Sequence, residues 1–423
     1  MSAIRLSQCM IVKNEEKNIE RALSWAKGIA YEQIVVDTGS TDRTVEIAEH
    51  MGAKVFPFKW VNDFSAAKNY AIDQASGNWI ALLDADEYVS AEHARLILPM
   101  IENIVKLYGS WVVALTSQWA QLKDDGSVSR IDRQQRFFIN HPEVRYERPI
   151  HETLKIPAGT FPVTENDIVI MHTGYSHGAY ADTNKLERNI ALLKKALESD
   201  PKDYKSKYHL ANELYLSRNI DAALPLCREV LKETACGGKD CEWFRIRAFY
   251  LLIAHLLYDT NACGEAYALA RQAFHEFPDH ANFSCLYGIS MYNQGRFEAA
   301  LEAFKIAEKL IAEGKIESLS LENADKLPTY LAQTNMMLGN ADEALRYALP
   351  YLQSHKQHEN MLKLFIRIIR SKESPENTAE LMSKIYDLKN IQDKMALLRC
   401  AKDMGDIALA KLFIQMIAPE ELR

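Results

Sequence analysis

Apolar runs alternate with amphipathic stretches through roughly the first 120 residues of the chain. Four segments, LSQCMIVKN, EQIVVDTGS, AKVFPFKW and NWIALLDADE, have the short, strongly apolar pattern of buried strands. Helical patterns lie between them, such as the stripe of Ile19, Ala22 and Leu23, and the segment TDRTVEIAEHMG, which Gly52 ends. These strand–helix units predict an α/β domain with a Rossmann-like, mostly parallel sheet covered on both faces.

Polar residues follow three of the predicted strands. The segments are Lys13 to Glu15, Asp37 to Ser40, and Asp84 to Asp86. The carboxyl ends of parallel strands share one edge of a sheet, and open α/β sheets bind their ligands there. We therefore expect the chemistry of the protein at this edge.

The pattern changes twice further along the chain. Residues 120–175 read as short antiparallel strands and long loops, and strand signals vanish after residue 182. Small residues then recur in pairs twelve positions apart: Ala211 with Ala223, Ala254 with Ala266, Gly288 with Ala300, and Ala332 with Ala344. Seven positions after each first member stand Arg218, Asn261, Gly295 and Gly339, and three of these four residues suit a left-handed turn between helices.

The starts of these repeats are 43, 34 and 44 residues apart, which matches the tetratricopeptide period of 34 residues with insertions near 233–243 and 312–324. We therefore predict an α/β domain over residues 1–181, an all-α superhelix of tetratricopeptide-like repeats over 182–353, and a helical extension over 354–423. Ala401, Gly405 and Ala408 weakly repeat the pattern in that extension. Such arrays present a concave binding surface or an oligomerisation face.

Composition narrows the class of protein. The 423 residues are 48% hydrophobic and 25% charged, with a net charge of -7, which fits a globular protein without the basic footprint of a nucleic-acid binder. The N-terminal segment lacks the pattern of a signal peptide, and no run of about 18 apolar residues predicts a membrane span.

Seven cysteines, an odd number, favour free thiols in a reducing cytoplasm. Cys236 and Cys241, the only close pair, fit a regulatory disulfide, half of a metal site or an ordinary loop.

Three acids crowd the end of the fourth predicted strand. On an extended segment Asp84 and Asp86 point to the same side, so both carboxylates can converge on one divalent cation. Without a cation, their repulsion would raise one of the two pKa values. The alternative is a solvated strand end, where acidic residues are common. We interpret Glu87, the third acid, as a turn residue.

Other polar residues have two interpretations each. Asp37 can accept from a nucleobase or a sugar hydroxyl, or it can cap the following turn or helix. Glu15 opens the first helix, where its charge also suits the helix dipole. Lys68 can approach a diphosphate or lie in solvent. His172, after the apolar run 168–171, is a metal ligand or an ordinary histidine at a strand end.

Four blocks, MIVKNEEKNIERAL, IVVDTGSTDRTVEIA, DFSAAKNYAI and WIALLDADEY, resemble in order and spacing the family 2 glycosyltransferases with the GT-A fold. That family binds a nucleotide-sugar, usually UDP-linked, and the resemblance implies the same donor here. By position, Asp37 contacts the uracil or ribose, and Glu15 lines the base pocket with the backbone from Met10 to Val12. Lys68 supports the nucleotide region.

The resemblance also implies a metal site. Asp84 touches the ribose or metal-bound water, and Asp86 holds Mn²⁺ or Mg²⁺ at the diphosphate. His172 completes the metal shell, and Ser40 and Ala85 belong to the same cofactor site.

The segments RQQRFFINHPEVRYERPIHETL and MHTGY, followed by the repeats, resemble the SunS-type S-glycosyltransferases. Those enzymes transfer a sugar from a UDP-sugar to a cysteine of a bacteriocin (glycocin) precursor peptide. The resemblance implies UDP-glucose or a related donor, a peptide or protein acceptor, and a homodimer through the helical repeats. The same layout also occurs in tetratricopeptide-linked family 2 enzymes of unknown acceptor.

An inverting transfer needs a base that deprotonates the acceptor, and His151 or Glu152 could serve. The chain lacks a clear Glu-Asp acceptor motif, and it lacks the QxxRW block of processive synthases. Arg133, Arg136 and Arg145, on the predicted short strands, could compensate diphosphate charge or lie at the surface, and Arg136 is the one we keep as a candidate.

These observations favour a metal-dependent inverting glycosyltransferase that moves a sugar from a UDP-sugar to a peptide or protein side chain. One alternative is a transferase acting on a lipid-linked or cell-surface glycan. Another, from a different class, is a tetratricopeptide scaffold whose first domain binds a nucleotide-sugar without catalysis.

Overall fold

The structure, a computed structural model, describes residues 3–164, 166–173, 183–235, 237, 239–260, 262–315 and 321–416. The chain divides into two compact units, one ending at Glu233 and one beginning at Thr234. The predicted fold class, a mostly parallel α/β domain followed by helical repeats, is confirmed. Cys236 and Asn261 lie outside the described residues, so the pairing considered for Cys236 stays a prediction.

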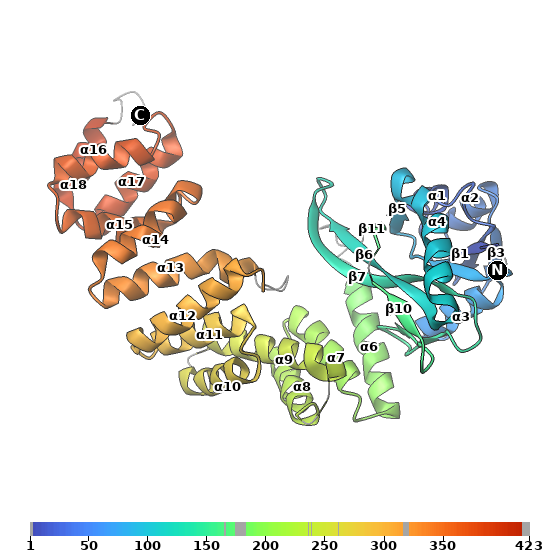
Figure 1. The fold of residues 1–423 in the computed structure, drawn as a ribbon. Helices are drawn as coiled ribbons and strands as arrows, with labels where there is room; N and C mark the ends of the chain where they lie inside the picture. Colours follow the sequence, from blue (N-terminus) through green and yellow to red (C-terminus); the bar gives the residue numbers. More distant parts are fainter. Residues whose placement is uncertain are drawn as a thin grey trace. The chain divides into compact units, whose positions relative to one another are not determined.

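Within the described residues, the first unit is built on a nine-stranded sheet (Figure 1). Its strands are β1 (Leu6–Val12), β2 (Glu32–Asp37), β3 (Lys54–Pro57), β4 (Trp79–Leu82), β5 (Glu87–Val89), β6 (Val112–Leu122), β7 (Val128–Ile139), β10 (Phe161–Val163) and β11 (Val169–His172). They are ordered β3-β2-β1-β4-β7-β6-β11-β5, and β10 pairs with β6 off this path. The first four are parallel, whereas β7 runs antiparallel to both β4 and β6. A small second sheet pairs β8 (Tyr146–Glu147) with β9 (Thr153–Leu154).

Helices and the sheet share apolar clusters in this unit. The helices between strands are α1 (Ile19–Ser24), α2 (Thr44–His50), α3 (Phe64–Asp73) and α4 (Ala91–Tyr108), with a 3-10 turn at Gly109–Trp111. Ile97 and Ile101 of α4 pack in one cluster with sheet residues, and Ala71 and Ile72 of α3 pack in another. β4 is buried along its whole length, which explains why its sequence is a continuous apolar run.

Among the described residues, three helices follow the sheet within the first unit. They are α6 (Thr183–Ser199), α7 (Tyr204–Leu216) and α8 (Ile220–Glu233). Ile150, from the loop between β8 and β9, packs with Leu193 of α6 and Leu210 of α7. By compactness the first helical hairpin therefore groups with the sheet, whereas the domain bounds 1–181, 182–353 and 354–423 stay predictions.

The second unit is helical throughout its described residues. Its helices are α9 (Lys239–Tyr258), α10 (Cys263–Glu276), α11 (Ala281–Tyr292), α12 (Phe297–Ala312), α13 (Leu321–Met337), α14 (Ala341–Ser354), α15 (Glu359–Arg370), α16 (Pro375–Ile385), α17 (Ile391–Asp403) and α18 (Ile407–Met416). Consecutive helices pack as hairpins, for example α11 with α12 and α13 with α14 (Figure 1). Three of the four pairs of small residues lie within these hairpins, and Ala211 and Ala223 lie on α7 and α8 of the first unit, as the tetratricopeptide pattern predicts.

Four of the described turns between paired helices share one backbone conformation. Gly295, Gly339 and Gly405 have positive φ angles of 73°, 78° and 70°, and Arg218 has a φ of 64°. In each turn the next N–H donates to a carbonyl five residues back, as at Arg296 to Met291, which is the bond of a Schellman motif. The weak repeat seen at Gly405 is therefore the same turn.

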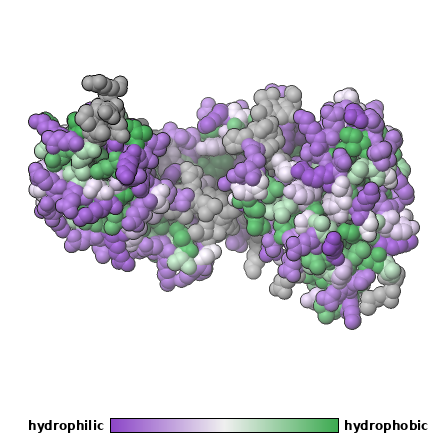
Figure 2. Space-filling view, turned by 90° about the horizontal axis from the view of Figure 1, so that it is seen from above, coloured by the Kyte–Doolittle hydropathy of each residue, from purple (hydrophilic) through white to green (hydrophobic). Residues whose placement is uncertain are grey.

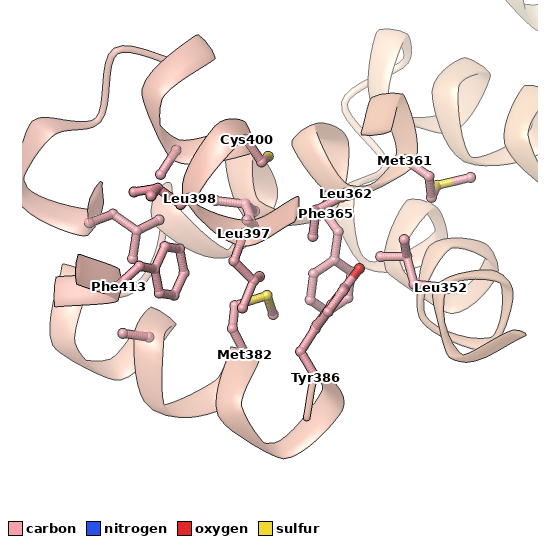
Figure 3. Close-up of a cluster of buried hydrophobic side chains, with 14 of the residues drawn as sticks. Leu352, Met361, Leu362, Phe365, Met382, Tyr386, Leu397, Leu398, Cys400 and Phe413 are labelled. Atoms are coloured by element: carbon pink, nitrogen blue, oxygen red, sulfur yellow. The ribbon is translucent and has the colours of Figure 1, made fainter. Parts of the chain in front are cut away.

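The last four helices pack against the α13–α14 hairpin in one apolar cluster (Figure 3). Leu352 of α14, Met361 and Phe365 of α15 and Tyr386 at the end of α16 contribute to it. The buried Tyr386 also donates a hydrogen bond from its hydroxyl to the main-chain oxygen of Lys356 at 2.8 Å. The C-terminal extension thus continues the hydrophobic core of the repeats.

The surface seen in Figure 2 is mostly hydrophilic, with apolar residues in small separate groups. Among the described helices, none combines the length and the hydropathy that a bilayer crossing requires.

Gly288 provides a test of the helix packing. A Cβ atom added there would lie 2.5 Å from Cε1 of Phe304, whereas a Cβ added at Gly264 of α10 meets nothing within 4 Å. We expect Gly288→Ala to lower the unfolding free energy of the second unit by about 1–3 kcal/mol through overpacking. The control Gly264→Ala is expected to be neutral or to stabilise by up to about 1 kcal/mol, because alanine favours a helix. Urea unfolding followed by circular dichroism measures both, and equal stability of the two variants would contradict the close packing.

Candidate active site

The acidic segment at the end of β4 forms a tight turn. The N–H of Glu87 donates to the main-chain oxygen of Asp84 at 3.0 Å, which closes a turn over residues 84–87. The expectation that Asp84 and Asp86 lie on an extended segment is therefore wrong. Because the chain turns between them, the two carboxylates have different partners.

Asp84 faces two cations of the protein itself. Its carboxylate lies 3.3 Å from Nζ of Lys68 and 2.9 Å from Nη2 of Arg136. Burial would raise the pKa of Asp84, but Lys68 and Arg136 lower that pKa well below its ordinary value. At Asp84, Lys68 of α3 and Arg136 of β7 therefore offset the repulsion expected from neighbouring carboxylates.

Glu87 is a buried structural residue. Glu87 closes the turn, as its interpretation as a turn residue requires, but its side chain is 0% exposed and makes buried contacts that the sequence did not indicate. One carboxylate oxygen accepts from Arg136 at 2.6 Å and from Nε1 of Trp119 at 2.8 Å, and the other accepts from the N–H of Asp84 at 3.0 Å. Burial raises the pKa of Glu87 while Arg136 opposes that rise. Because all these partners are donors, they favour the ionised carboxylate.

Lys68 is buried in the site, 3% exposed, rather than solvated. Its ammonium pairs with Glu152 as well as Asp84, and it lies 5.3 Å from the ring centre of Tyr146. Burial disfavours the charged form, but Asp84 and Glu152 raise the pKa of Lys68. In turn Lys68 outweighs burial and lowers the pKa of Glu152. Both groups are therefore charged near neutral pH.

Asp86 meets His172 at the neighbouring strand. Nε2 of His172 lies 3.3 Å from Oδ2 of Asp86, because β5 pairs antiparallel with the end of β11. The imidazole also lies against the ring of Trp119, with centroids 4.3 Å apart. Thr173 holds the turn from the same side, since its N–H and its hydroxyl both donate to the main-chain oxygen of Asp86 at 3.1 Å. The carboxylate of Asp86 is 29% exposed and thus open to a ligand.

Glu15 adds another carboxylate to this neighbourhood. Burial raises the pKa of Glu15, and the nearby charges of Asp86 and Asp84 raise it further, while a hydrogen bond from Asn18 opposes them. Asp84, Asp86 and Glu152 already outnumber the two cations Lys68 and Arg136. Negative charge is therefore in excess even without Glu15 and Glu87, whose pKa values are raised.

In the described part of the chain, no three His, Cys, Asp or Glu side chains converge into a metal cage. Asp86 and His172 alone present one oxygen and one nitrogen ligand. Mg²⁺ sites that also use substrate phosphates need no more than one or two carboxylates from the protein. The donor set therefore fits a cation that is shared with a diphosphate.

The loop after β2 is tied to the loop after β1. The carboxylate of Asp37 accepts from the N–H groups of Gly39 and Ser40, so it stabilises its own turn. The hydroxyl of Ser40 accepts from the N–H of Asn14 at 2.9 Å. The main-chain oxygen of Val12 already accepts from Thr38. These contacts fix the edge where the base pocket is predicted.

The side chains of Ala85 and His151 pack against groups outside the charged cluster. The methyl group of Ala85 packs in an apolar cluster with Val12 and Val35, so its main chain alone is left for a cofactor. The ring of His151 stacks on that of His209 of α7, with centroids 3.7 Å apart and an angle of 9°. Burial lowers the pKa of His151 to about 4, so the imidazole is neutral near pH 7.

The structure distinguishes among the three candidate arginines. Arg136 lies in the site, whereas Arg133 donates to the main-chain oxygen of Thr164 and Arg145 pairs with Asp73. Sequence reasoning missed Trp119 and Tyr146 as parts of the site. Trp119 lies on β6, in the antiparallel half of the main sheet, and Tyr146 lies on β8, in the small second sheet. No local sequence pattern marks either residue as part of the site.

Comparison with known proteins identifies the family of this chain. Residues 7–153 match the model of glycosyl transferase family 2. A TPR repeat-containing protein of Synechococcus elongatus is 30% identical over 305 residues, which cover 67% of this chain and 71% of that protein. This chain belongs to the family 2 glycosyltransferases.

Two further likenesses are more limited. The glycosyltransferase SunS of Bacillus subtilis is 29% identical to this family 2 glycosyltransferase over 220 residues, which cover 51% of this chain and 50% of SunS. Glucosyl-3-phosphoglycerate synthase from Mycobacterium tuberculosis, solved with Mn²⁺, UDP and glucosyl-3-phosphoglycerate, is 24% identical with a TM-score of 0.24. That match covers 27% of this chain and 44% of the synthase, and so low a score establishes no shared fold.

Arg136 provides a test of the buried charge cluster. Arg136→Met leaves the buried carboxyl group of Glu87 without its cation, and we expect the variant to lower the unfolding free energy of the first unit by about 3 kcal/mol. The control Arg133→Met, on the exposed part of the same strand, should stay within about 0.5 kcal/mol of the parent. Tryptophan fluorescence during urea unfolding reports on this unit, because five of the six tryptophans precede Glu233. Equal stability of the two variants would contradict the role of Arg136.

Proposed function

We propose that this family 2 glycosyltransferase is a metal-dependent inverting enzyme that moves a sugar from a UDP-sugar to a peptide or protein side chain. The observation that carries the proposal is the pair of Asp86 and His172, which meet at 3.3 Å beside an excess of carboxylates. A site with surplus negative charge favours the binding of a cation, and a cation bound there favours the binding of a diphosphate.

Asp86 and His172 are the proposed ligands of Mn²⁺ or Mg²⁺. When bound, the ion would neutralise charge that develops on the diphosphate of the leaving UDP. Asp84 takes a different role, because Lys68 and Arg136 already hold its carboxylate. Asp84 orders the turn that presents Asp86, and its side chain, 37% exposed, is proposed to contact the ribose of the donor or water bound to the metal.

The base pocket is proposed along the edge formed by β1 and β2. Glu15, Asp37 and Ser40 lie there with the backbone ending at Val12, and the contacts between their loops support a preformed pocket. We propose UDP-glucose or a related UDP-sugar as the donor.

Glu152 is the better placed of the two candidate bases. Its carboxylate is ionised and belongs to the cluster around Lys68, whereas the ring of His151 stacks on α7. In the proposed step, the acceptor S–H or O–H gives its proton to Glu152. The acceptor lone pair forms a bond to the anomeric carbon as the bond from that carbon to the UDP oxygen breaks, and UDP leaves with the electron pair. A thiol, with an ordinary pKa of about 8.5, needs the least help from such a base.

Asp86→Asn tests the metal site. We expect Mn²⁺-dependent hydrolysis of UDP-glucose to fall by about a hundredfold or more, because one of two protein ligands is lost. The control Asp125→Asn removes a carboxylate from the exposed loop between β6 and β7 and should leave the rate unchanged. Circular dichroism checks that the helical repeats stay folded. Full activity of Asp86→Asn, or parent activity that is insensitive to EDTA, would refute the metal site.

The acceptor needs a separate experiment. Peptides that carry cysteine, serine or threonine are incubated with a panel of UDP-sugars, and mass spectrometry identifies the modified residue. We expect transfer to a peptide, with cysteine as the favoured side chain. Products only on lipid-linked or free glycans would refute the peptide acceptor.

A further inference from the structure

The loop that carries Glu152 has an unusual backbone. Arg148 and His151 have positive φ angles of 85° and 50°, although neither is glycine. The left-handed region costs an ordinary residue about 1–2 kcal/mol, so such conformations persist only where surrounding contacts fix them. Two of these residues within four positions therefore indicate a loop that is held from outside.

One face of α7 supplies those contacts. The guanidinium of Arg148 donates to Oδ1 and Oδ2 of Asp203 at 3.2 and 2.6 Å, and to the hydroxyl of Ser206 at 2.8 Å. One turn further along, His209 stacks on His151. Residues three apart lie on the same side of a helix, so Ser206 and His209 of α7 form a single contact surface with Asp203, the N-cap of that helix.

Helix α3 holds the other side of the loop. The N–H of Phe64 donates to the main-chain oxygen of Pro149 at 2.8 Å, and the hydroxyl of Ser65 donates to that of Arg148. Lys68, one turn later, pairs with Glu152. The loop is thus clamped between a helix of the sheet domain and the first helix of the repeats.

We propose that Asp203, Ser206 and His209 are positioning residues that hold the loop 148–152 in its strained form and thereby set Glu152 at the reaction site. This inference rests on the proposed function, because it takes Glu152 as the base. The first repeat hairpin, formed by α7 and α8, then positions the base in addition to any surface that it offers to the acceptor.

Asp203→Ser is the decisive variant. Serine keeps the N-cap of α7 but removes the carboxylate that holds Arg148. The matched control is Glu233→Gln. Glu233 ends α8, and its carboxylate pairs with Lys207 of α7, so the control also neutralises a carboxylate that binds α7. We expect kcat of Asp203→Ser to fall about tenfold or more with the Kd of UDP unchanged, because misplacement of the base affects the chemical step alone. The control should retain the parent kcat, and equal kcat values for the two variants would overturn the proposal.

A double-mutant cycle tests whether the effect passes through Glu152. In the Glu152→Gln background, Asp203→Ser should change kcat by less than about twofold, because the base that it positions is absent. Fully multiplicative effects would show that α7 acts on the reaction by another route and would refute the assignment.

Hydrogen–deuterium exchange separates this inference from the proposed function. Asp203→Ser should speed amide exchange in a peptide covering residues 146–156, and Glu233→Gln should not. Unchanged exchange overturns the positioning role whether or not the protein transfers sugar. If the parent protein shows no transfer with any UDP-sugar, the proposed function fails, while faster exchange would still support the clamp.

Discussion

A single guanidinium group connects the two halves of the sheet at its functional edge. Arg136 comes from β7, in the antiparallel half, and it binds both carboxylates that open and close the turn after β4. That turn directs β5 to pair with β11, and this pairing brings His172 to Asp86. The position of the candidate metal ligands therefore depends on an ion pair that neither of them makes.

The two aspartates of the turn have separate roles. Asp84 is neutralised from within by Lys68 and Arg136, whereas Asp86 faces outward with a histidine beside it. A pair of equivalent carboxylates would repel each other until a cation arrived. Here the protein neutralises Asp84 with its own cations, so the remaining negative charge lies on Asp86, where a ligand can reach it.

Local sequence patterns were sufficient for the fold and for the edge that carries the site. Apolar runs located the strands of the parallel half, and the small residues located the helical hairpins and their left-handed turns. The burial of Glu87 could not be predicted, because it depends on pairing between strands about eighty residues apart. The assumption of an extended segment failed because a hydrogen-bonded turn leaves no distinct signal in D-A-D-E.

To predict which arginine enters the site, one also needs the register in which β7 pairs with β4 and β6. Along β7, Arg136 precedes two buried phenylalanines that pair with β4, whereas Arg133 lies where the strand is exposed. The sequence alone could not distinguish these positions, because the bulges in the pairing with β6 interrupt a simple alternation. The roles given to Asp37, Ser40 and Glu152 stay proposals, since their contacts within the protein do not reveal a donor or an acceptor.

The apolar cluster around Ile150 has a consequence for exchanging parts between related enzymes. Phe64 and Ile150 are covered by leucines of α6 and α7, so the sheet and the first helical hairpin share one core. A chimera joined at residue 181 would bring a foreign hairpin against this core and against the strained loop beside it. A junction after Glu233 keeps both intact, so helical arrays from relatives can be exchanged there while the native support of the loop is kept.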